Sequence, residues 1–355
     1  MSGDLSERLG LSHPIVQAPM IGPKPALAHA VSAAGGLGSL GCAAMSPDQV
    51  RAEVVALRSV TDRPFNLNFF AHRRPVPDAE REAAWGGRLA PYYAEFGLDT
   101  DAPVTTPERV PFDAAMAALV AELRPAVVSF HFGLPDDALL APVRASGCLV
   151  FGCATTVREA RWLAERGVDA VIAQGSEAGG HRGMFLTEDV AGQVGTLALV
   201  PQVVDAVRLP VIAAGGIADA RGVAAAFVLG ATLAQVGTAY LLCPEAGISE
   251  PHRAALLAAR DEDTALTNVF TGRPARGLLN RALRDLGPMD PQAPAFPRAA
   301  PALQPLRNAA EAQGSGDFSP LWSGQAASLA RPMGAGDLTR RLAKGADLVR
   351  ARFPA

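Results

Sequence analysis

The stretch VIAAGGIADARGVAAAFVLGATLAQVGT, residues 211–238, contains two short apolar runs, and each of them ends at a glycine turn. The first run, 211–214, precedes a Gly-Gly pair, and the second, 232–236, precedes a Gly-Thr pair. The segment between them, 219–229, has the apolar pattern of a helix. Continuous apolar strands joined by a helix are typical of a parallel sheet that is buried on both faces. The stretch therefore predicts two neighbouring units of a parallel β/α fold.

The same alternation extends over most of the 355 residues. Apolar runs suited to buried strands occur at 14–17, 36–40, 65–69, 126–130, 148–151, 170–174, 211–214 and 232–236. Helix patterns lie between most of them, at 25–34, 47–60, 112–123, 136–145, 156–166 and 219–229. Eight parallel strands with intervening helices compose a (β/α)8 barrel, whose usual size is roughly 250 residues. We therefore predict an α/β fold of the TIM-barrel class.

Two segments are additional to the strands and helices of a minimal barrel. Residues 70–111, rich in arginine, proline and tyrosine, interrupt the connection after the third strand, and residues 250–355 follow the eighth strand. The tail contains helix patterns at 251–259, 302–312 and 336–352 around a proline-rich loop. We predict a barrel over residues 1–249, with 70–111 as an accessory insertion, and a C-terminal helical lid over 250–355 packed on the barrel mouth.

Charge and composition exclude several classes of partner. The formal net charge of −3 provides no positive field for nucleic acid or an anionic membrane. The uncharged run 222–244 is long enough to span a bilayer, but Gly230 and the strand pattern after it favour a helix, a turn and a buried strand. The four cysteines form neither a CxxC pair nor a disulfide framework, and the N-terminus lacks a secretory signal. We expect a cytoplasmic protein that acts on small molecules.

The two glycine turns predict a phosphate site. Gly215 and Gly216 follow the seventh predicted strand, and Gly237 and Thr238 follow the eighth. In barrels of this class the loops after these two strands often bind phosphate, because backbone amides approach it closely there. Ordinary turn chemistry is the competing interpretation, since Gly-Gly pairs are also common in strand-to-helix loops. The paired positions favour the phosphate.

The loop after the sixth predicted strand, QGSEAGGHRG at 174–183, is the densest group of polar residues among the strand ends. His181 has an unperturbed pKa near physiological pH, so it suits a base or a cation beside an anionic substrate. Arg182 either binds the same anion or braces an acidic neighbour. His131 ends the fourth predicted strand between two phenylalanines, where a hydrogen-bonded wall residue and a catalytic residue are equally expected.

Two other motifs carry little weight. GLGSLG at 36–41 matches the GxGxxG spacing of dinucleotide sites, but a helix pattern precedes it and the glycines run through the strand itself. No HExxH motif or Cys/His cluster indicates a metal site, and we expect none.

Several segments together resemble one enzyme family, the nitronate monooxygenases. They are PIVQAPM (14–20), AGGLGSLG (34–41), FNLNFF (65–70), VSFHFG (128–133), QGSEAGGHRG (174–183), AAGGI (213–217), QVGTAYLLCPEAG (235–247), FTGRPARGLLNR (270–281) and LWSGQAA (321–327). The resemblance covers nearly the whole chain, and the sequence is similar to the class I bacterial members of the family.

The resemblance implies a barrel with FMN across its mouth. It implies cofactor contacts from Ala18, Pro19, Met20, Gly22, Asn68, Gln174, Gly179, Gly180, Gly215, Gly216, Gln235, Gly237 and Thr238. It assigns the catalytic histidine to His181 and places His131, Arg182 and Met20 at the substrate. The tail loop carries Phe296 and Arg298, and no tail residue is assigned a catalytic role.

The implied reaction is the oxidation of a small alkyl nitronate, such as propionate 3-nitronate, by O2. It passes through a flavin semiquinone and yields a carbonyl compound and nitrite. An FMN-dependent NAD(P)H reductase, similar to the enoyl and quinone reductases, is the alternative. A non-redox barrel for sugar phosphates is disfavoured, because the strand ends carry no lysine or paired carboxylates. The expected partners are a nitronate and O2, with neither nucleic acid nor membrane, and homodimer formation is left open.

Overall fold

Eight parallel strands form the centre of the molecule. The computed structural model of the chain describes residues 5–20, 25–100 and 109–352. Its large sheet has the order β1-β9-β8-β6-β5-β4-β3-β2, with every pair parallel. The strands are β1 (Ile15–Gln17), β2 (Gly38–Gly41), β3 (Phe65–Phe70), β4 (Val127–His131), β5 (Leu149–Ala154), β6 (Ala170–Gln174), β8 (Val211–Ala214) and β9 (Leu233–Val236). They coincide within a few residues with the eight predicted runs, and the predicted barrel class is confirmed.

The sheet closes on itself through its first two strands. A parallel bridge joins Val16 to Leu37, just before β2. The amide of Gln17 donates to the carbonyl of Leu37, and the amide of Leu37 donates to the carbonyl of Ile15, both at 2.9 Å. Closure leaves no free sheet edge and brings all the carboxyl ends of the strands to one rim.

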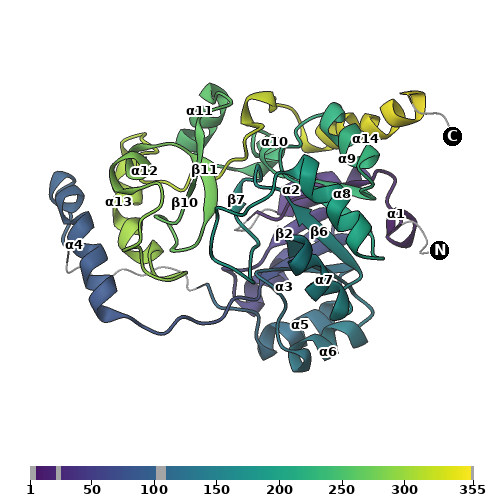
Figure 1. Cartoon of the computed structure of the whole chain (residues 1–355), viewed down its shortest axis with the longest axis horizontal. Helices are drawn as coiled ribbons and strands as arrows, with labels where there is room; N and C mark the ends of the chain where they lie inside the picture. Colours follow the sequence, from purple (N-terminus) through teal and green to yellow (C-terminus); the bar gives the residue numbers. More distant parts are fainter. Residues whose placement is uncertain (1–4, 21–24, 101–108, 353–355) are drawn as a thin grey trace.

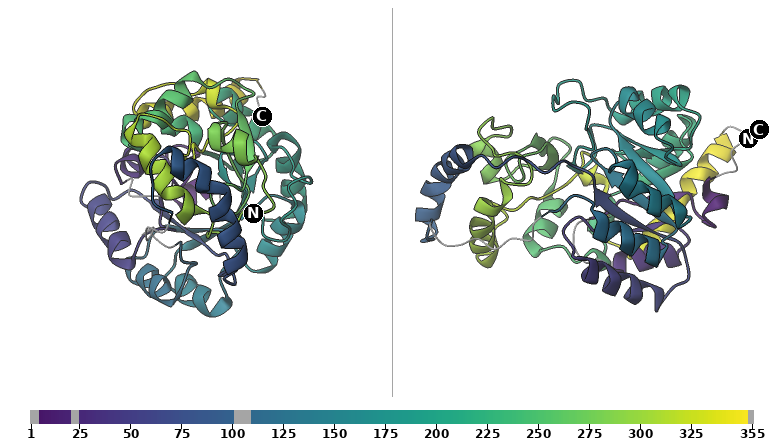
Figure 2. Two further views of the ribbon diagram at one scale, coloured as in Figure 1. Left: turned by 90° about the vertical axis from the view of Figure 1, so that its left-hand side faces the viewer. Right: turned by 90° about the horizontal axis from the view of Figure 1, so that it is seen from below.

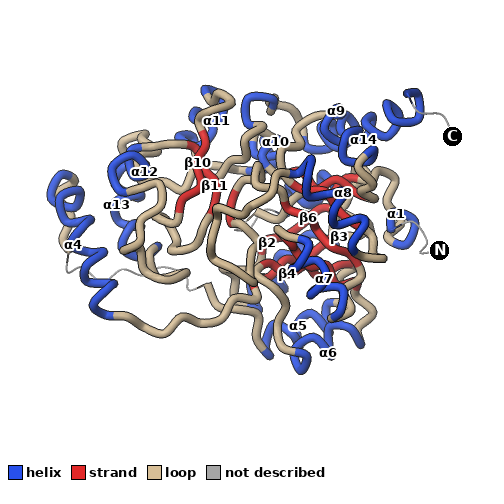
Figure 3. The backbone as a smooth tube through the Cα atoms, viewed as in Figure 1, coloured by secondary structure: helices blue, strands red, loops and turns tan. Residues whose placement is uncertain are grey.

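Helices surround the strands on the outside (Figures 2 and 3). They are α2 (Pro25–Ala33), α3 (Pro47–Arg58), α5 (Ala114–Leu123), α6 (Asp137–Ala145), α7 (Val157–Glu165), α8 (Thr196–Ala206) and α9 (Ala220–Val228). Local signals begin several of them: the carboxylate of Asp219 accepts from the amides of Arg221 and Gly222 at the start of α9. Six of these helices match predicted segments, whereas α8 does not.

Two apolar layers hold the barrel together. The larger layer lies between the strands and the surrounding helices and includes Leu27, Val54 and Leu163. The smaller layer contains side chains of the strands, such as Ile172 and Ile212, together with Leu5 of α1 (Leu5–Arg8) and Leu9, which follows the helix. Helix α1 lies at the end of the barrel that faces away from the accessory elements (Figure 1). The carboxyl rim is thus left to the accessory elements and to the candidate site.

The accessory elements gather at the other end of the molecule (Figure 1). They are α4 (Ala79–Glu95) from the insertion, and α11 (Glu250–Ala258), β10 (Thr264–Thr267), β11 (Ala275–Leu278), α12 (Arg281–Leu286) and α13 (Ala300–Ala312) from the tail. Trp85, Leu89, Leu283, Leu303 and Phe318 share one apolar cluster, so insertion and tail pack on each other. The two tail strands were not among the predicted elements, and β11 pairs antiparallel with β7 (Gly180–His181) of the strand-six loop.

The last helix, α14 (Ala335–Arg352), returns to the barrel wall and packs against α9 and α2. The contact is close, because a Cβ atom added at Gly345 would lie 2.6 Å from the carbonyl oxygen of Ala220. The tail therefore supplies both accessory elements at the rim and part of the outer wall. The division of the chain at residue 249 into barrel and lid stays a prediction.

The uncharged run 222–244 forms most of α9, all of β9 and the short helix α10 (Thr238–Leu241), as its pattern predicts. None of the helices in the described ranges combines the length and the apolar character that a bilayer crossing requires.

Candidate functional site

A cavity of about 410 Å³ opens where the strand ends meet the accessory elements. Most of the residues predicted for cofactor or substrate line it. These are Ala18, Pro19, Met20, Asn68, His131, Gln174, Gly179, Gly180, His181, Gly215, Gly216, Gln235, Gly237 and Thr238. Gly22 lies outside the described residues, and Arg182 does not line the cavity. The structure thus brings together loops from six different strand ends, while the roles of their residues stay predictions.

Glycine is required at one end of this cavity for two reasons. Gly215 and Gly216 have φ of +113° and +69°, which side chains rarely adopt. Gly179 has another constraint, because an added Cβ would lie 2.5 Å from the amide nitrogen of Gly324 in the tail. The main chain of three segments therefore reaches the cavity wall without side chains between, as a bound phosphate requires.

His181 is 6% exposed and is held at both its backbone and its ring. Its carbonyl accepts from Gln174 Nε2 at 3.1 Å and from His131 Nε2 at 3.0 Å. The Gln174 side chain also accepts the amide of Gly183 through Oε1, at 2.8 Å, so it clamps both sides of the loop. The ring Nε2 lies 2.9 Å from Thr271 Oγ1 of the tail. These bonds fix the imidazole against the cavity wall.

The hydrogen bonds also indicate which nitrogen of His181 carries the proton. Thr271 Oγ1 donates to the carbonyl of Arg273 at 3.4 Å, which leaves the hydroxyl oxygen to accept from His181 Nε2. The neutral tautomer then has hydrogen on Nε2 and a lone pair on Nδ1. Nδ1 is thus the ring atom available to a substrate.

The charge around His181 opposes its protonation. Burial holds its pKa well below the usual value, and the cations Arg109 and Arg273 and two neighbouring histidines lower it further. The carboxylate of Glu177, which also lines the cavity, is occupied by the amide and hydroxyl of Thr196, each at 2.9 Å. The histidine end of the cavity is therefore electropositive with a neutral imidazole, which suits an anionic ligand.

Two other histidines, the buried His72 and the partly buried His131, make stability depend on pH. Burial is the main cause that lowers the pKa of His131 and of His72 to about 4. The unfolded chain, in which histidine titrates near 6.5, binds more protons between pH 6.5 and 4, so the free energy of unfolding should fall as pH drops through this window. Urea titrations at pH 7, 6 and 5 measure this, and His131→Gln should flatten the slope. Equal stability at all three values would contradict the assignment.

Arg182 is placed away from the predicted substrate contact. Its guanidinium is fully buried and donates to Gly175 O at 2.6 Å, Gln174 O at 2.8 Å and Gln193 Oε1 at 3.0 Å. Burial lowers the pKa of Arg182 to about 10, so it remains charged at neutral pH. In this geometry all three acceptors belong to the protein, and the arginine braces the strand-six loop from behind.

Replacing Arg182 by Met should therefore affect stability more than substrate binding. It leaves three buried acceptors without a donor, and the free energy of unfolding should fall by about 3 kcal/mol. The KM for a nitronate should change less than about threefold, because Arg182 does not line the cavity. Urea unfolding and steady-state kinetics measure the two effects, with Arg182→Lys as the control that keeps the charge. An intact fold with a greatly raised KM would restore the substrate role.

The sequence analysis missed functional candidates that come from distant segments. Arg109, at the end of the insertion, and Trp322, in the tail, both line the cavity. Phe296 packs against His181 with ring centroids 5.3 Å apart, and Thr271 binds its Nε2. The matching segments LWSGQAA and FTGRPARGLLNR contain Trp322 and Thr271, and Phe296 was noted in the tail loop, but the sequence analysis assigned none of them a role and found no signal for Arg109. Their positions depend on how the accessory elements dock.

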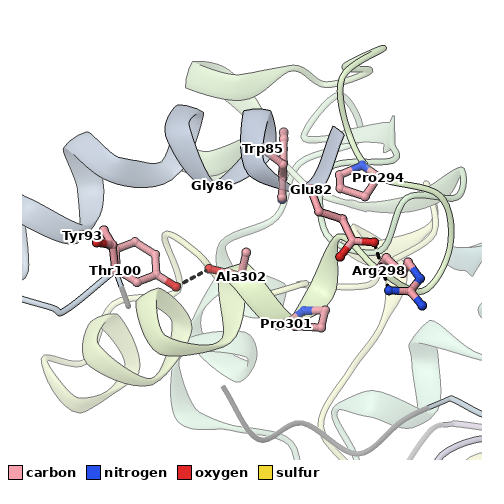
Figure 4. Close-up of a pocket in the computed structure, with 9 residues that line it drawn as sticks. All are labelled: Glu82, Trp85, Gly86, Tyr93, Thr100, Pro294, Arg298, Pro301 and Ala302. Carbon is pink, nitrogen blue, oxygen red and sulfur yellow. Dashed lines mark hydrogen bonds and ion pairs between the residues drawn. The ribbon is translucent and has the colours of Figure 1, made fainter. Parts of the chain in front are cut away.

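A second cavity, of about 320 Å³, lies where α4 meets the tail (Figure 4). Glu82 Oε1 pairs with Arg298 Nη1 at 3.0 Å, and the hydroxyl of Tyr93 donates to Ala302 O at 2.7 Å. These polar groups satisfy one another across the contact between insertion and tail, and Arg298 is thereby kept from the main cavity. Within the described ranges, no group of three His, Cys, Asp or Glu residues could hold a metal ion.

Comparisons with known proteins agree on one family. The family described as nitronate monooxygenase matches residues 4–345. The chain belongs to the nitronate monooxygenase family. A nitronate monooxygenase of Pseudomonas aeruginosa is 45% identical, over 96% of this chain and 98% of the relative. One of Paraburkholderia phytofirmans is 44% identical, over 94% and 92%. As a member of this family, the chain is an oxidoreductase, and a flavin cofactor is implied.

Two solved structures resemble this member of the nitronate monooxygenase family in fold. A nitroalkane oxidase from Streptomyces ansochromogenes superposes with a TM-score of 0.87 at 40% identity, covering 99% of this chain and all of that one. FabK from Thermotoga maritima superposes with a TM-score of 0.71 at 27% identity, covering 98% and 97%. The accessory elements are therefore included in both likenesses.

Proposed function

We propose that the chain is an FMN-dependent nitronate monooxygenase that oxidises small alkyl nitronates of the propionate 3-nitronate type with O2. The expected products are a carbonyl compound and nitrite. The observation that carries the proposal is a buried, neutral histidine beside the cavity-lining cation Arg109, while Glu177, the carboxylate among the described lining residues, is already bonded to Thr196. Such a site stabilises an anion without offering a charged acid to transfer a proton to it.

The residues at the cavity fit a flavin phosphate. The Gly215–Gly216 turn and Gly179 leave main chain facing the cavity, and Gly237 and Thr238 border it from the next strand. Gln235 pairs with Ala214, just before the Gly215–Gly216 turn, and its buried Oε1 has no hydrogen-bond partner in the described structure. A ligand N–H or O–H would satisfy this acceptor, which otherwise costs about 1–3 kcal/mol. The glycine turns thus suit the phosphate of FMN, and Gln235 offers an acceptor to another polar group of the same ligand.

The chain's own residues would bind and orient the substrate. When bound, FMN supplies the electron acceptor for the nitronate and the electron donor for oxygen. His181 would stay neutral and would orient the nitronate by contact with its ring, while the charge that attracts the anion would come from the cations around it, Arg109 and Arg273. Phe70, Phe296 and Trp322 surround the imidazole, with ring centroids 5.9, 5.3 and 5.5 Å away, and exclude water from it.

The test is turnover of propionate 3-nitronate by purified protein in air, following oxygen uptake and nitrite release. Nitrite should form without NADH or NADPH. The likeness to FabK keeps a reductase as the second candidate. Nicotinamide-dependent flavin reduction with no nitrite would replace the proposed function with that candidate. A colourless protein that binds no flavin would remove both.

A further inference from the structure

One arginine at the main cavity has no anionic partner among the residues that the structure describes. Arg109 lines the cavity, and its Nη1 is buried with no hydrogen-bond acceptor in the described structure. A buried guanidinium N–H without an acceptor is costly, and a ligand oxygen would remove that cost. The arginine can therefore bind an anion that a ligand supplies.

The other arginines near the site are already engaged. Arg182 donates to three protein oxygens, and Arg276 donates to Ser176 O at 2.9 Å and Thr264 Oγ1 at 3.1 Å. Arg307, which also lines the cavity, pairs with Glu311 at 3.0 Å. Arg273 keeps one unpaired N–H, its Nε, but its Nη2 donates to Met184 O and it does not line the cavity. Arg109 is thus the cavity arginine with a free donor.

The surroundings of Arg109 favour the binding of an anion. Burial and the charge of Arg307 lower the pKa of Arg109 to about 10, so it stays protonated at neutral pH. Both causes oppose its charge, and no carboxylate of the described residues contributes in the other direction. Its guanidinium lies 5.9 Å from the ring centroid of Phe296, which supports a cation but does not neutralise it.

Arg109 also lies at the histidine end of the cavity. The guanidinium of Arg109 lies over the ring of Phe296, and the ring centroids of Phe296 and His181 are 5.3 Å apart. The positive charge of Arg109 also lowers the pKa of His181. A short substrate can therefore meet both side chains at once. The nitronate group belongs at His181, and the second anionic group would extend toward Arg109.

We propose that Arg109 binds a carboxylate carried by the substrate away from its nitronate carbon, and that it selects acidic nitronates over plain alkyl nitronates. This inference rests on the proposed function. A planar, bidentate guanidinium is well suited to a carboxylate, and a charge-assisted pair of this kind gains about 1.5–3 kcal/mol. That range corresponds to roughly 10- to 150-fold in kcat/KM.

The test compares two nitronates that differ at one end. Propionate 3-nitronate carries the carboxylate, and the nitronate of 1-nitropropane carries a methyl group in its place. In Arg109→Gln, kcat/KM for the acid should fall roughly 30-fold, while that for the propyl compound changes less than about threefold. Arg109→Lys should recover part of the loss, because it keeps the charge without the bidentate geometry.

Arg298→Gln is the matched control. Arg298 lies in the same accessory region but pairs with Glu82 at the second cavity (Figure 4), so the ratio of the two substrates should not change. Equal losses on both nitronates in Arg109→Gln would overturn the proposal and assign Arg109 to the nitronate group. Unchanged kinetics on both would overturn it as well.

A binding measurement separates this inference from the proposed function. Succinate resembles propionate 3-nitronate in shape and charge but does not react, and butyrate lacks one of its carboxylates. Titrations followed by flavin absorbance should show tighter binding of succinate than of butyrate, and Arg109→Gln should abolish the difference. If the wild type releases no nitrite, the proposed function fails while the succinate preference still decides the role of Arg109. Equal binding of both acids by the wild type would refute that role.

Discussion

Gly216→Asp is expected to give a folded protein that no longer retains FMN. The substitution places a carboxylate where the flavin phosphate is proposed to bind, and the added Cβ would lie 3.5 Å from Cβ of Glu177, a second acid. Like charges in close contact cost several kcal/mol. We expect the Kd for FMN to rise by at least about 100-fold, measured by titrating the apoprotein and following the quenching of flavin fluorescence.

Gly216→Asn is the matched control for this experiment. Asn has nearly the shape of Asp, and both belong to the few side chains that tolerate positive φ, here +69°. The backbone strain and the added volume are thus the same in the two variants, and only the charge differs. Asn should weaken FMN binding by less than about tenfold. If the two variants bind FMN equally, charge is not the reason, and the phosphate does not lie at this turn.

The barrel could be predicted because its signals are local. Each strand is a short apolar run, and glycines proposed to bind the cofactor directly follow the strand ends, as Gly215 and Gly216 follow β8. Helix α8 was missed because its signals are weak: Gly195 caps it without a side chain, Pro201 lies inside it, and its first turns, Thr-Leu-Ala-Leu-Val, resemble a strand. Packing against α7 and β6 fixes it as a helix instead.

The remaining cavity wall could not be predicted, because distant segments supply it. Arg109 and Thr271 are far apart in the sequence. Arg109 nevertheless lowers the pKa of His181, and Thr271 forms a hydrogen bond with its Nε2. Their positions follow from the apolar cluster that joins α4 to the tail and that includes Trp85 and Phe318. A single sequence carries no record of which surface the insertion covers. The charge and tautomer of His181 could not be predicted from the sequence for the same reason.

His181→Asn is expected to retain FMN and to lose most nitronate turnover, with kcat falling by about 100-fold or more. The side chain is not part of the proposed phosphate turn Gly215–Gly216, so the flavin absorbance per protein should stay close to wild type. Asn keeps a polar atom near the position of Nδ1 but loses the ring contacts and the bond to Thr271. Nitrite release and absorbance spectra measure the two effects. Full turnover in this variant would remove His181 from the site.

The depressed pKa of His181 sets a further expectation for the wild-type protein. Surrounding cations make its imidazole a weak base, so wild-type protein should act on preformed nitronates far faster than on neutral nitroalkanes, which must first lose a carbon-bound proton. Thr271→Val separates position from basicity, because it removes the partner of Nε2 while leaving the cations in place. It should lower kcat for the nitronate by roughly tenfold. If it instead gave rapid turnover of neutral nitroalkanes, the tautomer held by Thr271, rather than the cations, would be what keeps His181 from acting as a base.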